Sequence, residues 1–143
     1  MKQIILVAGT LLVINTATAQ HLKEAEVPTS VKASFAKKYN TSKVEAWEKE
    51  GEDYEAEFHL NKVESSAVFS ADGIYKELEQ DIKITELPKT VTEYCSKNFS
   101  GYKISETAKI TDANGKIMYE AEMTKGKEHL DAIFDSKGSF IKK

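Results

Sequence analysis

The chain has 143 residues, a net charge of −3 and 20 lysines but no arginine. Proteins that bind nucleic acids usually present a basic face and use the planar guanidinium group for bidentate contacts, so this composition argues against a nucleic-acid partner. The single cysteine cannot form an internal disulfide, and a chain of this length can bury a core without one.

The first residues have the order of a secretory signal peptide. A lysine at position 2 precedes an apolar run over residues 4–14, and small residues then end in an Ala-x-Ala pattern at Ala19. The apolar run is shorter than the roughly 20 residues that span a bilayer, which disfavours the alternative of a retained membrane anchor. We therefore expect a signal peptide at 1–19, a mature chain from Gln20, a periplasmic or extracellular location and no stable membrane insertion after cleavage.

The remaining chain contains an internal similarity. Val27-Pro28 recurs as Leu87-Pro88, the segment 54–58 recurs at 119–123, and Gly73 recurs as Gly138. The spacing between matches widens once, and we place the extra residues in a loop at 110–116. An ordered series of this kind predicts one domain over 20–143 that is built from two repeats, at about 26–80 and 86–143.

Each repeat has the pattern of a helix followed by four strands. Pro28 begins a helix whose apolar stripe is Val31, Phe35 and Tyr39, and the second copy repeats it with Pro88, Val91, Cys95 and Phe99. Strand-like alternation is clearest at 54–60 and 117–124, with further strands expected near 44–47, 64–70, 74–79, 103–107, 128–135 and 139–142. The fold class is therefore α+β, a tandem α-β-β-β-β unit with a mainly antiparallel sheet and helices on one face.

These motifs resemble the PepSY-like family of exported bacterial proteins, which is also described as β-lactamase-inhibitor-like. The features that carry the resemblance are Val27-Pro28, Trp47, the segment 54–58 and Asp72-Gly73, with a second copy from Leu87 to Gly138. The resemblance implies a curved sheet whose open face contacts a protein partner, and it brings no catalytic residues. The second copy departs from the first, because Thr107 stands in the place of Trp47.

The sequence shows no familiar catalytic motif, such as a phosphate-binding glycine loop or a His-Glu-x-x-His pair. Cys95 takes the place of Phe35 on the apolar helix stripe, so we interpret it as a buried core residue rather than a reactive thiol. We accordingly expect a protein that is not an enzyme and needs no cofactor.

Three residues are candidates for contact with a protein. Val44 and Ala46 share one side of a strand by simple alternation, which places Trp47 on the other side together with Glu45. An exposed tryptophan is a typical anchor of a protein interface, and the alternative is packing beneath a loop or the neighbouring repeat. Met118, on the polar side of its strand, is a second candidate.

The acidic faces of two strands suggest a different function, namely binding of a metal or a small ligand. Glu55, Glu57 and His59 alternate along one strand, and Glu120 and Glu122 lie at the matching positions of the second copy. Carboxylates and imidazole are ligands of divalent metals, so these five residues predict a metal or small-ligand site if the strands lie close together, with His129 as a further ligand. The alternative is that these residues have no ligand and form a sheet face exposed to water.

We therefore predict an exported, non-catalytic binding protein. Its partner is expected to be an exported or envelope protein, such as a hydrolase that it restrains, held on the open face of the sheet. The alternative is a periplasmic protein that binds a small ligand or a divalent metal through the acidic strand faces.

Overall fold

A computed structural model of the chain describes residues 20–141. The expected signal peptide at 1–19 lies outside the described residues. No helix within 20–141 has both the length and the apolar character that crossing a bilayer requires.

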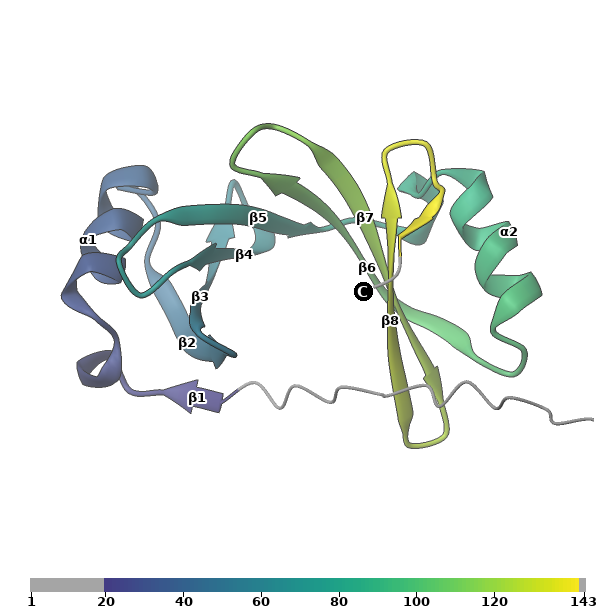
Figure 1. Cartoon of the computed structure of the whole chain (residues 1–143), viewed down its shortest axis with the longest axis horizontal. Helices are drawn as coiled ribbons and strands as arrows, with labels where there is room; N and C mark the ends of the chain where they lie inside the picture. The colour runs from purple at the N-terminus through teal and green to yellow at the C-terminus, as the bar shows by residue number, and fades with distance from the viewer. Residues whose placement is uncertain (1–19, 142–143) are drawn as a thin grey trace, which may run out of the picture.

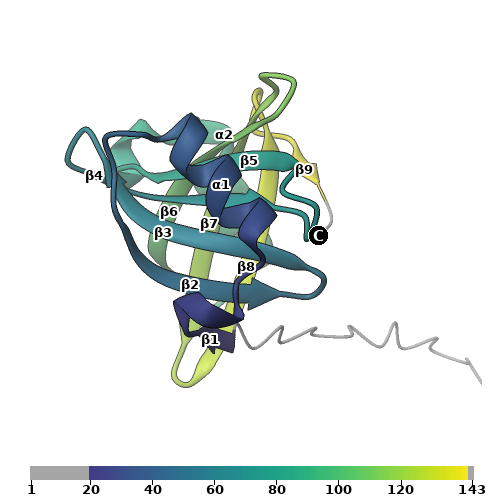
Figure 2. The same ribbon diagram turned by 90° about the vertical axis from the view of Figure 1, so that its left-hand side faces the viewer.

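All nine strands of the described chain belong to one antiparallel sheet, and their order in the sheet is their order in the sequence (Figures 1 and 2). The first part of the chain contains β1 (Gln20–Leu22), the 3-10 turn η1 (Glu24–Glu26), α1 (Thr29–Lys38), β2 (Val44–Glu50), β3 (Asp53–Leu60), β4 (Val63–Phe69) and β5 (Tyr75–Asp81). The second part contains η2 (Ile84–Glu86), α2 (Lys89–Asn98), β6 (Lys103–Asp112), β7 (Ile117–Lys125), β8 (Glu128–Asp135) and β9 (Phe140–Ile141). The predicted order of one helix followed by four strands thus occurs twice.

Both helices pack on the same face of the sheet. Leu78 packs against the core under α1, and Tyr119 packs against the core under α2. The pairing of β5 with β6 and of β6 with β7 places these two side chains on the same face of the sheet. The helices nevertheless lie at opposite ends of the molecule, with the strands between them (Figure 1). The sheet must therefore curve away from the helices, as expected from the resemblance, and Figure 2 shows β6–β8 crossing β2–β5 at a steep angle as strand twist accumulates.

Two separate cores lie beneath the two helices. Under α1, Phe35 makes edge-to-face contacts with Phe58 and Trp47, at ring-centroid distances of 5.0 and 5.9 Å. Under α2, Cys95 occupies the place of Phe35 and packs with Met123 and Phe134. The interpretation of Cys95 as a core residue is confirmed by its exposed fraction of 3%.

The expected position of Trp47 is wrong. The register shifts between Val44 and Ala46, so that Glu45 is an extra residue in β2 and the alternation of sides is interrupted. Val44 and Trp47 therefore point to the same side, and Trp47 lies opposite Ala56 in the α1 core with only 7% of its surface exposed. A bulge cannot be read from simple alternation, and this one moves the tryptophan away from the open face.

The same bulge occurs in the second half, between Ile104 and Glu106. It places Thr107 on the helix side opposite Ala121, as Trp47 lies opposite Ala56. The Thr107 hydroxyl donates a hydrogen bond of 2.6 Å to the carbonyl oxygen of Ile82, and the Ile82 N–H donates one of 3.0 Å to the Thr107 carbonyl. Thr107 therefore replaces an aromatic core contact with a link between β6 and the chain that enters η2.

The extra residues of the second half are not all in a loop. β6 has ten residues where β2 has seven, so the strand continues through the first three residues of the segment expected to be a loop, 110–112. Only residues 113–116 form the turn into β7. The added length brings Ile110 into the sheet opposite Met118 and Glu79, which extends the open face between the two halves.

Candidate functional site

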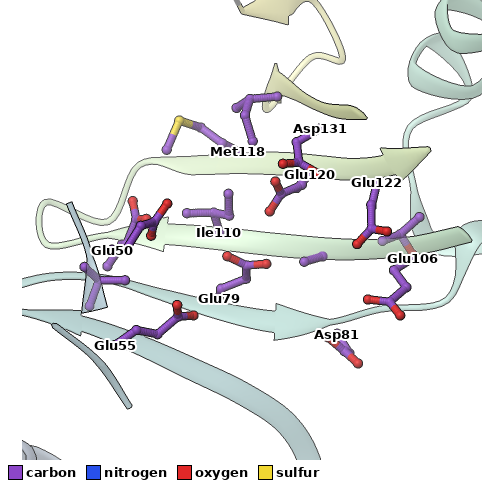
Figure 3. A pocket seen from close by; sticks show the side chains of 15 residues that line it. Glu50, Glu55, Glu79, Asp81, Glu106, Ile110, Met118, Glu120, Glu122 and Asp131 are labelled. Atoms are coloured by element: carbon purple, nitrogen blue, oxygen red, sulfur yellow. The ribbon is translucent and has the colours of Figure 1, made fainter. Parts of the chain in front are cut away.

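The face of the sheet without helices is hollowed into a groove of about 470 Å³ (Figure 3). Residues from β2 to β8 line it, so both halves of the chain contribute to a single surface. Nine of its fifteen lining residues are acidic, namely Glu50, Glu55, Glu77, Glu79, Asp81, Glu106, Glu120, Glu122 and Asp131. None of the fifteen is a lysine or a histidine, so the lining itself carries charge of one sign.

Four of the other lining residues form an apolar floor. Val68 and Ile133 occupy matching positions in β4 and β8, and Ala108 and Ile110 lie between them in β6. All four are buried although they point away from both helices. Met118 stands at the same side of the groove as Asp131 and Glu120 (Figure 3). The groove therefore combines an apolar floor with carboxylates along its length.

Carboxylates crowd together at one end of the groove. Glu106, Glu122 and Asp131 lie directly opposite one another on β6, β7 and β8, and Asp81 lies at the same end (Figure 3). Directly opposed residues of antiparallel strands have Cβ atoms about 5 Å apart, and like charges at that distance are unfavourable. Glu122 is also 3.1 Å from Nδ1 of His129, which lies just outside the lining.

The groove raises the pKa values of several of these carboxyl groups. The neighbouring Glu122 charge raises the pKa of Glu106, with a further contribution from burial. Burial raises the pKa of Asp81, and the charge of Glu64 adds to the effect. At the opposite end, burial raises the pKa of Glu55 in spite of a hydrogen bond from Ser66. Negative charge in the groove is thus unfavourable in the isolated protein.

The predicted site residues do not form one cluster. Met118, Glu55, Glu120 and Glu122 line the groove, whereas Trp47 is in the α1 core. Glu45 is exposed at the β2 bulge, where its Oε1 lies 2.7 Å from Nδ1 of His59. Glu57 is on the open face but outside the groove lining, and burial raises its pKa.

The five residues of the expected metal site do not converge. Glu55, Glu57 and His59 belong to β3, whereas Glu120 and Glu122 belong to β7, and three strands separate β3 from β7 in the sheet. Within residues 20–141, no group of three or more His, Cys, Asp or Glu side chains is arranged to hold a metal ion. β3 and β7 are thus not neighbouring strands, and of the five residues Glu55, Glu120 and Glu122 line the groove.

Sequence reasoning missed several residues of the groove. Glu79 and Asp81 alternate with Leu78 and Gln80 along β5, and this pattern was a usable signal for an acidic open face. The apolar floor gave no such signal. Val68 and Ile133 each sit within a short run of apolar residues, in which sequence alone does not tell which side chain faces the helix.

Comparison with known proteins gives a family and several related folds. The model of the family described as "Putative beta-lactamase-inhibitor-like, PepSY-like" matches residues 14–65 and again 60–142. No curated protein sequence matches the chain.

Three solved structures illustrate the similarity of fold. A crystal structure described as a putative periplasmic protein from Bacteroides eggerthii DSM 20697 has a TM-score of 0.66 at 20% identity, with 81% of this chain and 86% of that chain covered. A DUF2874 family protein from Bacteroides uniformis ATCC 8492 gives 0.65 at 19% identity, covering 80% and 86%. A BLIP-like protein from Bacteroides fragilis NCTC 9343 gives 0.60 at 18% identity, covering 80% and 84%. At these identities the likeness concerns the fold alone.

Proposed function

Since this chain belongs to the PepSY-like, β-lactamase-inhibitor-like family, we propose that it is an exported binding protein that holds a protein partner in the open groove of its sheet. The observation that carries the proposal is the groove itself. Val68, Ala108, Ile110 and Ile133 line this groove among its carboxylates, and no helix covers it, so an occupant would meet both apolar and charged groups. Apolar centres surrounded by polar groups are typical of protein interfaces.

The proposed protein is built from two copies of one unit, at about 26–80 and 86–143. Support comes from the two segments matched by the family model and from the bulge that recurs in β2 and β6. The copies act jointly in this proposal, because β3–β5 and β6–β8 supply opposite sides of the groove. A partner seated there contacts both copies at once.

The proposed role is non-catalytic. Cys95, the one cysteine of the chain, is buried beneath α2, and burial raises its pKa away from the reactive thiolate form. The family description is inhibitor-like, which supports an exported or envelope hydrolase as the class of partner that the protein restrains. Export itself rests on the signal peptide expected at 1–19 and on the periplasmic description of the similar Bacteroides eggerthii protein.

Site-directed photo-crosslinking in the source cell tests the proposal. A photoreactive residue replaces Met118 in the groove, and a second form carries it at Lys97 on the outer side of α2. We expect a partner protein to be cross-linked from position 118 and not from 97. The partner is then purified and its affinity measured directly; if it is a hydrolase, its turnover is assayed with and without the protein. Cross-linking from 97 alone, or from neither position, would contradict the proposal.

Trp47→Ala is not a suitable variant for this test. Because Trp47 packs against Phe35 in the core, its removal disturbs the fold and any loss of binding would follow from that disturbance. Met118 is the better position, since its side chain lines the groove.

A further inference from the structure

The chemistry of the groove narrows the kind of protein segment that it can hold. At one end Asp81, Glu106 and Glu122 lie together, and at the other end Glu50 and Glu55 do (Figure 3). The apolar floor of Val68, Ala108, Ile110 and Ile133 runs between the two ends, with Glu79 and Glu120 beside it, and no lysine or histidine is among the residues that line the groove (Figure 3). An occupant must therefore be apolar along its length and positively charged where it meets the carboxylates.

Lysine and arginine side chains have both properties. Their methylene stems pack on apolar surface while the charged group reaches outward to a carboxylate. A groove of about 470 Å³ accommodates a few such side chains together with the apolar residues between them. An acidic segment would instead meet charges of its own sign at both ends, and like charges brought together at an interface are strongly unfavourable.

The state of the empty groove agrees with this assignment. The pKa values of Glu55, Asp81 and Glu106 are raised because burial and neighbouring carboxylates disfavour the charged forms. A cation placed within about 4–6 Å of these groups reverses that effect. The free protein thus holds an unfavourable arrangement that a basic occupant relieves, which is typical of a site that is shaped for its ligand rather than for stability.

We propose that the occupant of the groove is a lysine- or arginine-bearing segment of the partner protein, whose apolar residues rest on the floor while its cationic groups contact the carboxylates at the two ends. This proposal rests on the proposed function and specifies the chemistry of the partner. The source of the cations is a polypeptide, because the apolar lining residues of the groove come from three strands, β4, β6 and β8, and the side chains of an extended chain can contact all three while its cationic groups reach the carboxylates.

Binding of labelled synthetic peptides to the purified exported protein tests the proposal. The probes are a short peptide of alternating lysine and leucine, the same peptide with serine in place of lysine, and the same peptide with glutamate in place of lysine. We expect the lysine peptide to bind, its affinity to fall as NaCl is raised, and the glutamate peptide not to bind. The serine peptide should bind at least on the order of tenfold more weakly than the lysine peptide.

Two variants with the same change in net charge test whether the lysine peptide binds at the groove. The groove variant combines Asp81→Asn, Glu106→Gln and Glu122→Gln. The control combines Asp72→Asn, Glu24→Gln and Glu93→Gln, which are exposed residues of a turn, η1 and α2 outside the groove lining. The groove variant should weaken binding of the lysine peptide on the order of tenfold, and the control should leave it within about twofold. Equal losses in both variants would show that only net charge matters and would overturn the proposal.

Other results separate the two proposals. Equal binding of the serine and lysine peptides would overturn the cationic occupant while leaving protein binding in the groove intact. If no peptide binds, the proposal of a cationic occupant is overturned as well. The proposed function is then decided only by the photo-crosslinking result at position 118. If spermidine displaces the lysine peptide completely and the peptide binds no more tightly than spermidine, the groove is a site for free amines and the polypeptide assignment is wrong.

Discussion

Glu106 and Glu122 lie directly opposite each other on β6 and β7, with both side chains on the open face of the sheet. The charge of Glu122 is the largest cause of the raised pKa of Glu106. Opposed like charges on neighbouring strands weaken a sheet, so this pair lowers the stability of the free protein. Its presence at the end of a groove is most simply explained by a contribution to binding.

Glu106→Gln should therefore stabilise the isolated protein. The substitution removes the repulsion from Glu122 and keeps nearly the same shape, and we expect a gain of about 0.5 kcal/mol in the free energy of unfolding at low ionic strength. Glu106 is exposed, so salt should screen most of the gain. Urea denaturation at low and high NaCl measures it; a loss of stability at low salt would contradict the repulsive arrangement.

Trp47→Ala should destabilise the fold strongly. The indole is 7% exposed and contacts Phe35 and the α1 core, so its removal leaves a cavity that costs about 3–5 kcal/mol. Trp47→Phe should cost clearly less, because an aromatic ring is retained. Chemical denaturation followed by circular dichroism measures both. A Trp47→Ala protein as stable as the native one would mean that this residue is not in the core.

Mild acid should raise the stability of this protein. The pKa values of Glu55, Glu57, Asp81 and Glu106 are raised, so the folded state binds protons more readily than the unfolded state. Stability is then lowest above the raised pKa values and increases as the pH falls through them toward the ordinary carboxyl range near 4. Melting temperatures between about pH 7.5 and pH 5 test this expectation.

The groove variant with Asp81→Asn, Glu106→Gln and Glu122→Gln provides the control for the pH experiment. It removes two of the groups with raised pKa and one source of the repulsion, so its melting temperature should rise less on acidification. An identical rise in the native protein and the variant would place the origin of the effect elsewhere.

Alanine substitutions at Gly73 and Gly115 separate the effect of a steric clash from the effect of backbone strain. Both have positive φ, of 80° and 82°, so alanine at either position is strained by roughly 1–2 kcal/mol. At Gly73 a Cβ atom would also lie 2.6 Å from the carbonyl oxygen of Ser30, whereas at Gly115 it would meet nothing within 4 Å. Gly73→Ala should therefore destabilise clearly more than Gly115→Ala in thermal denaturation. Equal effects would mean that the turn at Gly73 does not press against α1.

Local patterns determined most of the secondary structure. The stripe of Val31, Phe35 and Tyr39 predicted α1, and alternation at 54–60 and 117–124 predicted β3 and β7. These features depend only on residues within one helical turn or along one strand, so they can be predicted from the spacing of residues in the sequence. The same patterns indicated the family, whose motifs are structural.

The tertiary structure alone decided where the side chains of the site lie. The bulge at Glu45 turned Trp47 into the core, and pairing of β5 with β6 joined two acidic faces into one groove. A bulge depends on how two strands pair, and the groove depends on the curvature of the whole sheet, so neither is encoded in the spacing of residues along one strand. The sequence by itself determined an α+β chain with acidic strand faces, and the curvature of the sheet decided that those faces surround an apolar floor.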